Sequence, residues 1–138
     1  MLDWILNIHT FASGIMTGLV WFVQINHYPL FLYINAEDFP KYEEQHVRRT
    51  GWIVAPTMLI ELCACIGLAC LHPSFWFSYV NSALVITIWL STFFIQMPIH
   101  GRLRKMGKAD HSIRTLIFSN WLRTITWTVV FVGLLLNR

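Results

Sequence analysis

Four long apolar runs, separated by short polar segments, dominate the pattern of the chain. They extend over residues 4–34, 51–71, 75–99 and 115–136. The first and third runs contain no Asp, Glu, Lys or Arg, and each of the other two contains one charged residue, Glu61 and Arg123. A helix needs roughly 18 to 20 apolar residues to cross the hydrocarbon core of a bilayer, and each run is long enough. The pattern therefore predicts an all-α integral membrane four-helix bundle with antiparallel up-down topology.

The polar segments set the predicted boundaries within a single transmembrane domain of residues 1–138. We expect membrane helices at about residues 3–34, 51–71, 74–101 and 112–136, with inner loops at 35–50 and 102–111. The first inner loop predicts a polar interfacial helix before the second membrane helix, which either runs directly into that helix or bends at Gly51. Asn35 or Asp38 can cap such a helix, and Pro40 suits its first turn.

Composition and charge support a membrane protein and give its orientation. Hydrophobic residues make up 56% of the chain and charged residues only 12%, whereas an ordinary soluble domain has about 25% charged residues. The basic residues gather in the two inner loops, which the positive-inside rule places in the cytoplasm with both termini outside. The net charge of +3 is thus a topology signal and predicts no nucleic-acid partner. We expect an integral protein of the bacterial inner membrane, surrounded by the lipid bilayer, whose protein partners would be further copies of itself or other membrane subunits.

Four of the six histidines fall at the predicted cytoplasmic face: His27, His46, His100 and His111. Glu43 and His46 have the three-residue spacing that places two side chains on one face of a helix, as in metal sites of helical bundles. Carboxylate and imidazole donors arriving from separate helices suit Fe, Zn or Cu. The predicted metal ligands are Glu43, His46, His100 and His27. The residues expected to surround them or to line a pocket are Gln24, Tyr28, Arg49 and Gln96, with Tyr42 at most flanking the site.

Haem is the alternative cofactor. His9 lies near the outer end of the first helix, and His27 and His100 offer ring nitrogens nearer the inner side. Gly14 and Gly18 leave room beside the first helix for a large ring. Axial histidine ligation would make the protein a redox protein.

Glu61 and Arg123 place opposite charges inside two apolar runs. Glu61 is ten residues past Gly51, and Arg123 is eight residues past Thr115, so both lie roughly 12 to 15 Å along helices that start at the same face. Charges inside a membrane usually pair or face a cavity. We expect an intramembrane ion pair between them, assisted by Asn120. The pair would either fix the helix register or serve a ligand or a proton.

Two similar stretches suggest an internal repeat. "WFVQINHYP" ends the first predicted helix and "FFIQMPIHG" ends the third. Each stretch has aromatic residues, a Gln, a His a few residues later and a nearby Pro, and each leads into a basic loop. Two helical hairpins related by an axis along the membrane normal would produce this pattern.

The first helix carries a family resemblance. His9, the apolar stretch that contains Trp21, and the sequence "YPLF" loosely resemble the start of the membrane-embedded protoporphyrinogen oxidase family, over about the first 60 residues. The resemblance implies a helical haem-associated protein with His9 as a haem ligand. That family also uses a lysine in a later helix, and the predicted third helix here has none. The layout also resembles small four-helix bacterial membrane proteins, a likeness that implies no activity.

Three functions follow as hypotheses. The first is a metal- or haem-dependent oxidoreductase with its site near the cytoplasmic face. The alternative is a non-catalytic structural subunit of a larger membrane complex, which the small size and the very short outer segments favour. The third is a small transporter or proton path that uses Glu61 and Arg123.

Overall fold

The structure is a computed structural model, which describes residues 2–72 and 76–137. Helices account for nearly all of these residues, and no strand occurs among them. Four helical segments are long and apolar enough to cross a membrane: Leu2–Tyr33, Phe39–Leu71, Trp76–Met106 and Asp110–Leu136. The prediction of an all-α protein with four membrane helices is confirmed at this level.

Two of the four segments are interrupted, and two are continuous. The first consists of α1 (Leu2–Phe22), a π-helical turn η1 (Val23–His27), α2 (Tyr28–Leu30) and a 3₁₀ turn η2 (Phe31–Tyr33). The second is the single helix α3 (Phe39–Leu71). The third consists of α4 (Trp76–Ser91), the π-helical turn η3 (Thr92–Gln96) and α5 (Met97–Met106), and the fourth is α6 (Asp110–Leu136).

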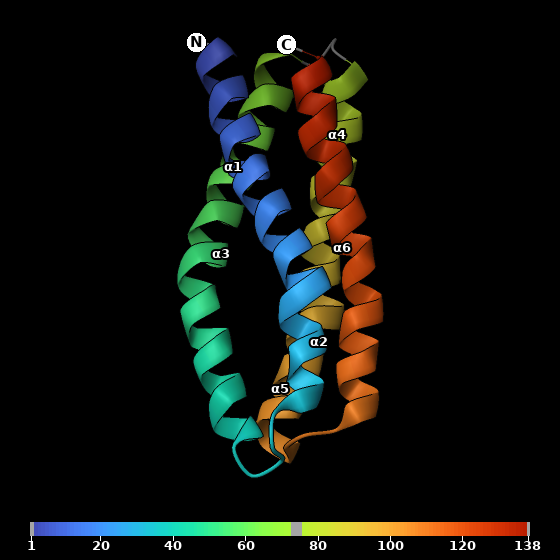
Figure 1. Ribbon diagram of the computed structural model, residues 1–138. Coiled ribbons are helices and arrows are strands. Elements are labelled where there is room, and N and C mark those ends of the chain that lie inside the picture. The colour runs from blue at the N-terminus through green and yellow to red at the C-terminus, as the bar shows by residue number, and fades with distance from the viewer. Residues whose placement is uncertain (1, 73–75, 138) are drawn as a thin grey trace.

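Both termini lie at one end of the bundle, which we call the terminus end (Figure 1). The opposite end, called the loop end, holds the connection from η2 to α3 and the connection from α5 to α6 (Figure 1). Lys108, in the second of these connections, donates through Nζ to the carbonyl oxygens of Leu32 and Ile34, at 2.7 and 2.9 Å. The lysine thereby satisfies carbonyls at the end of the first helical segment and ties the two connections together.

Helices extend into both predicted inner loops. Residues 39–50 are helical and run directly into the apolar part of α3, which is one of the two predicted arrangements, and residues 102–106 belong to α5. No residue between Pro40 and Gly51 breaks a helix, so the polar segment and the apolar run join without interruption. Pro56 is accommodated inside α3. The predicted start of the third membrane helix, Ser74, lies outside the described residues.

The two interrupted segments share one local feature. The π turn η1 is followed by Tyr28 and Pro29, and η3 is followed in the same way by Met97 and Pro98. A proline inside an α-helix lacks an N–H and its ring clashes with the carbonyl four residues earlier, so a locally wider turn relieves the conflict. The common π turn and proline support the internal repeat. They also redirect the side chains of Gln24, His27 and Gln96, which lie within the two turns.

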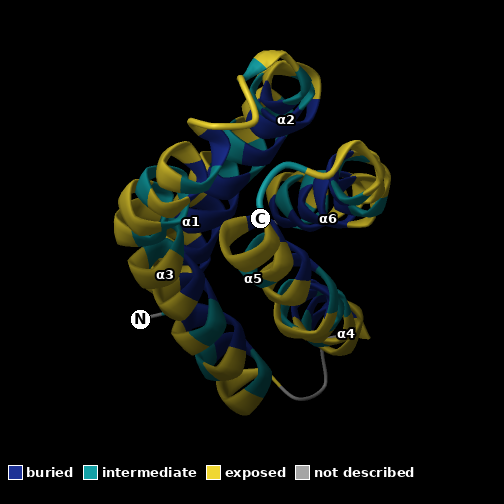
Figure 2. Ribbon diagram, turned by 90° about the horizontal axis from the view of Figure 1, so that it is seen from below, coloured by how far each residue is buried: buried dark blue, intermediate teal, exposed yellow. Residues whose placement is uncertain are grey.

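Buried residues face the middle of the bundle, and exposed residues cover its outside (Figure 2). Large apolar side chains such as Phe94, Phe118 and Trp52 are among the exposed residues, as expected where lipid covers the protein surface. The interior has two apolar clusters, one built around Met16, Trp127 and Leu134 and one around Phe31 and Leu116. Many polar side chains are buried alongside them, and such groups need partners in an apolar environment.

Candidate functional site

The main polar group at the loop end consists of His27, Tyr28, Glu43, His46 and His100, which we call the histidine cluster. Four elements supply it: η1, α2, α3 and α5. Glu43 is fully buried and Tyr28 almost so. Three of the predicted metal ligands therefore reach the same place as Glu43, although they are far apart in sequence.

One half of the histidine cluster is a chain of three side chains. The Tyr28 hydroxyl and His100 Nε2 are 3.0 Å apart, and His100 Nδ1 forms a short contact with Glu43 Oε1. An ionised carboxylate only accepts hydrogen bonds, so His100 carries its proton on Nδ1 and accepts through Nε2 from the hydroxyl. A hydroxyl, an imidazole and a buried carboxylate are thus linked in series.

The other half of the cluster is a pair of imidazoles. His27 Nε2 and His46 Nδ1 are 2.7 Å apart, and Thr50 Oγ1 is 3.2 Å from the same His46 nitrogen. The ring centroids of His27 and His46 are 4.6 Å apart, and those of His46 and His100 are 5.4 Å apart. His46 is therefore the member of the pair whose ring lies 5.4 Å from His100, and it connects His27 to the Tyr28–His100–Glu43 chain.

The local sequence explains this arrangement. Glu43 and His46 share one face of α3 because they are three residues apart. The π turn before Pro29 places His27 and Tyr28 against that face, and Phe31 packs edge-on against His27 and His46. The π turn η1 precedes α2 and the π turn η3 precedes α5, and residues of η1, α2 and α5 meet Glu43 and His46 of α3.

The cluster is a hydrogen-bond network rather than a preformed metal centre. Within the described part of the chain, no group of three or more His, Cys, Asp or Glu side chains is arranged to hold a metal ion. The physical reason is that the facing nitrogens of His27 and His46 bond to each other, and both nitrogens of His100 are engaged. Glu43 Oε2, however, is buried with no hydrogen-bond partner in the structure.

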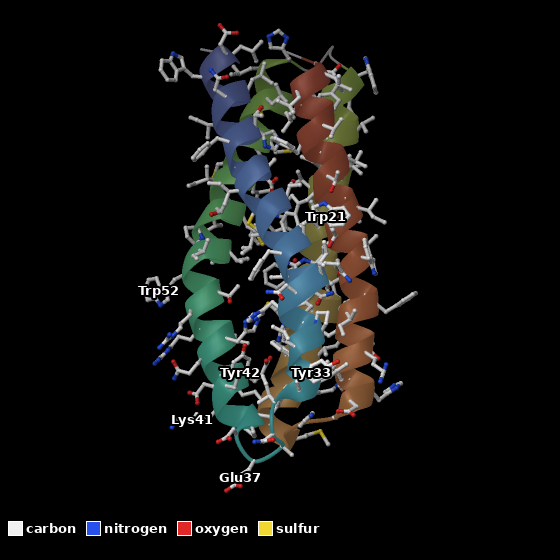
Figure 3. All side chains as sticks on the ribbon, in the orientation of Figure 1. Trp21, Tyr33, Glu37, Lys41, Tyr42 and Trp52 are labelled. Atoms are coloured by element: carbon white, nitrogen blue, oxygen red, sulfur yellow. The ribbon has the colours of Figure 1, made fainter. Side chains whose placement is uncertain are left out.

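A cavity of about 510 Å³ opens beside the imidazole pair. The uncharged side chains that line it include His27, His46, Tyr42 and Thr50. Its lining also includes Asp38, Lys41, Gln45 and Arg49. Lys41 and Tyr42 come from the loop end of α3 (Figure 3). Arg49, predicted as a pocket residue, therefore lines a cavity that reaches the histidine cluster.

The two glutamines connect the cluster region to α6. Gln24 donates to the carbonyl of Ile117 at 3.1 Å and accepts from Asn120 Nδ2 at 3.0 Å. Gln96 donates to Ser119 Oγ at 3.1 Å, and its buried Oε1 has no partner. Both side chains therefore bond to α6, where they hold the helices that carry His27 and His100.

The predicted direct ion pair between Glu61 and Arg123 is not formed. Glu61 is fully buried and accepts from Ser13 Oγ at 2.6 Å and from Trp127 Nε1 at 2.9 and 3.1 Å. The Arg123 guanidinium lies 5.0 Å from the centroid of the Trp127 ring and donates to Asn120 Oδ1 at 3.4 Å. Both charged residues are buried near each other, but they contact the same indole instead of each other, because Trp127 follows Arg123 by one helical turn and fills the space between them.

His9 belongs to a separate polar group nearer the terminus end. Its Nε2 is 2.8 Å from Asn81 Nδ2, which also lies 3.3 Å from Cys65 Sγ. His9 precedes His27 by 18 residues in one helical segment, which corresponds to about 27 Å along a helix axis. A single haem could not use both histidines, and the role of His9 as a haem ligand stays a prediction.

Sequence reasoning missed the roles of Tyr28, Ser13, Trp127 and Asn81. The sequence predicts a pocket position for Tyr28 but no bond to His100, and it predicts no role for Trp127. The available signal was spacing. Trp127 is four residues after Arg123, and Ser13 is four residues after His9, so each lies on a face that already carries a polar residue.

Comparison of the chain with known protein families, with curated proteins and with solved structures finds no match. The resemblance of the first helix to the protoporphyrinogen oxidase family therefore stays a prediction.

Proposed function

We propose that this protein is a membrane-embedded enzyme that performs general acid–base chemistry with the histidine cluster. The observation that carries the proposal is the Tyr28–His100–Glu43 chain. A reactive hydroxyl within reach of a base that is itself oriented by a third group is the arrangement of an activated acid–base or nucleophilic site. The burial of Glu43 keeps water away from the chain.

The order of hydrogen bonds gives each residue a role. His100 Nε2 takes the proton of the Tyr28 hydroxyl, and Glu43 stabilises the imidazolium that results. The Tyr28 oxygen can then remove a proton from a carbon next to a substrate carbonyl. The electron pair of the broken C–H bond moves into the carbonyl and gives an enolate. Return of the proton to a different atom completes an isomerisation, with no oxidant or reductant required.

The position of the cavity indicates how the substrate reaches the cluster. The cavity lies at the loop end, where α3 changes from a charged to an apolar surface, and the ring centroid of His46, which lines it, is 5.4 Å from that of His100. An amphiphile with a polar head and an apolar chain fits this boundary. The positive-inside rule places this end of the bundle at the cytoplasmic face of the membrane.

The test is catalysis of hydrogen–deuterium exchange. Long-chain 1,3-diketones and 3-keto esters in phosphatidylcholine nanodiscs in D₂O serve as probes, and mass spectrometry follows the loss of protons between the two carbonyls. We expect exchange above the rate of protein-free nanodiscs, and the replacements Tyr28→Phe and Glu43→Gln should each reduce it. Equal rates with and without protein across the probe panel would contradict acid–base catalysis.

A metal-dependent oxidoreductase is the second candidate, and the unpartnered Glu43 Oε2 favours it. Rotation of His27 and His46 about their side-chain bonds would free ring nitrogens to join Glu43 around an ion such as Fe, Zn or Cu. Elemental analysis of purified protein should then find about one ion per chain, and His46→Ala combined with His100→Ala should lose it while the bundle stays folded. Unchanged metal content in that double variant would exclude this site.

An absorption spectrum of the same preparation tests haem, because bound haem gives a Soret band. The roles of structural subunit and of transporter or proton path stay predictions. A subunit should aggregate when it is purified without partners, whereas an enzyme of this type should be stable alone.

A further inference from the structure

Arg123 is a buried cation without a counterion. Only 7% of its surface is exposed. Among the described residues, Glu43–His100 is the only contact within 4.0 Å between a carboxylate oxygen and a side-chain nitrogen of Lys, Arg or His, so no carboxylate oxygen there lies within 4.0 Å of the Arg123 guanidinium. Its Nε has no hydrogen-bond partner, and its bond to Asn120 Oδ1 is long, at 3.4 Å.

The nearest carboxylates are committed elsewhere. Glu61 accepts three hydrogen bonds from Ser13 and Trp127, and Glu43 bonds to His100. Asn120 cannot replace them, because its amide is held by Gln24 and its carbonyl oxygen offers only a partial charge. An arginine stays charged in proteins, and a buried charge without a partner is strongly unfavourable. The structure therefore leaves a negative charge to be supplied from outside the chain.

The surroundings of Arg123 also connect it to the histidine cluster. Asn120 accepts from Arg123 and donates to Gln24. Gln24 precedes Tyr28 by four residues in the same helical segment, so Arg123 lies beside the segment whose Tyr28 hydroxyl bonds to His100. The guanidinium carbon lies 5.0 Å from the centroid of the Trp127 ring, and Arg123 Nε, which has no hydrogen-bond partner, remains available as a donor. A ligand oxygen at this nitrogen would lie next to the acid–base chain.

We propose that Arg123 binds an anionic oxygen of the substrate beside Tyr28, so that the substrate is an amphiphile whose head carries a carboxylate or an enolisable carbonyl. This inference rests on the proposed function and deepens it. Arg123 would hold the oxygen on which negative charge develops while Tyr28 exchanges the proton at the neighbouring carbon. Fixed donors aimed at a developing oxyanion are among the largest contributions to catalysis.

The test uses two probes of equal chain length, dodecanoate and dodecanol. Radiolabelled dodecanoate is bound at pH 8 to the protein in phosphatidylcholine nanodiscs, and unlabelled dodecanoate or dodecanol competes with it. A charge-assisted hydrogen bond predicts a preference of about tenfold or more for the carboxylate. Similar competition by both compounds on the wild-type protein would overturn the proposal, whether or not any variant folds.

Variants show which residue is responsible for the preference for dodecanoate over dodecanol. Arg123→Gln should abolish the discrimination, Arg123→Lys should keep part of it, and Arg114→Gln, an exposed arginine on the same helix, should leave it unchanged. If Lys41→Gln with Arg49→Gln abolishes the preference and Arg123→Gln retains it, the anion binds at the rim of the cavity and the assignment to Arg123 is wrong.

The binding test and the exchange test can contradict their two proposals independently of each other. Glu43→Gln should stop hydrogen–deuterium exchange without removing the preference for dodecanoate. An Arg123-dependent preference for the carboxylate without any exchange would support the anion site and contradict the acid–base function. Hydrogen–deuterium exchange without any preference for the carboxylate would support acid–base catalysis and exclude the anion-binding role of Arg123.

Discussion

The indole N–H of Trp127 donates to both carboxylate oxygens of Glu61, at 3.1 and 2.9 Å. The face of the same indole lies under the Arg123 guanidinium. One aromatic side chain thus contacts two opposite charges inside the bundle and keeps them from pairing. The depth of the two charged residues is as expected from their sequence positions, but Trp127 decides what each of them binds.

The bond between Trp127 and Glu61 should contribute strongly to stability. Trp127→Phe removes the donor and leaves a buried carboxylate with Ser13 alone, which should cost about 2 to 4 kcal/mol of unfolding free energy. Unfolding in mixed detergent micelles, followed by circular dichroism, measures the change.

A double-mutant cycle tests whether the stabilisation comes from this contact. Trp127→Phe and Glu61→Gln should be non-additive, with a coupling of about 1 kcal/mol or more, whereas Glu61→Gln and Arg123→Gln should couple less, because they are not in direct contact. A larger coupling for the second pair would mean that the direct ion pair exists in the membrane.

The Tyr28–His100–Glu43 chain should act as a unit. Tyr28→Phe and Glu43→Gln should each lower the rate of hydrogen–deuterium exchange by about 10²- to 10⁴-fold. The double variant should be hardly slower than either single variant, because groups that act together lose most of their effect when one is removed.

Nuclear magnetic resonance of the ¹⁵N-labelled imidazole provides a readout that does not depend on catalysis. His100 should carry its proton on Nδ1 in the wild-type protein and in Tyr28→Phe, because Glu43 accepts that proton in both. Glu43→Gln should weaken this preference. A proton on Nε2 in the wild-type protein would contradict the assigned direction of the chain.

Gly107 should be needed for the turn between α5 and α6. It has φ of +86°, the only positive φ among the described residues, and its N–H caps the end of α5 by donating to Leu103. Gly107→Ala should cost about 1 kcal/mol, since L-residues rarely adopt this conformation.

Gly101 is the matched control for Gly107. It lies inside α5, and an added Cβ would meet no other atom within 4 Å. Gly101→Ala should therefore be neutral or stabilise the protein by up to about 1 kcal/mol, because alanine has the higher helix propensity. Equal effects at the two positions, measured by thermal unfolding, would show that backbone conformation is not the cause.

Lys108 should hold the loop end closed. Lys108→Met keeps the apolar part of the side chain but loses both bonds to the carbonyls of Leu32 and Ile34. We expect a loss of about 1 to 3 kcal/mol and faster amide hydrogen exchange around those two residues. Lys105→Met, on the exposed last turn of α5, serves as the control and should change neither measurement.

The sequence by itself determined the four membrane helices, because their number depends on the length of the apolar runs and on the cost of a charge in lipid. It also determined that Glu43 and His46 share a helix face, since three-residue spacing fixes their relative direction. The histidines of the loop end could be placed at one depth by counting residues. The hydrogen-bond partners of these histidines could not be predicted, because depth does not specify which faces of different helices meet.

Only the tertiary structure decided the chemistry of the candidate site. The π turns before Pro29 and Pro98 changed the directions of His27 and Gln96, and a regular 3.6-residue period cannot anticipate such a change. The convergence of α2, α3 and α5 then joined Tyr28, His100 and Glu43 into one chain, and the insertion of Trp127 separated Glu61 from Arg123. These outcomes depend on packing between helices. If a helix turns about its axis by the angle between two successive residues, its side chains face different partners.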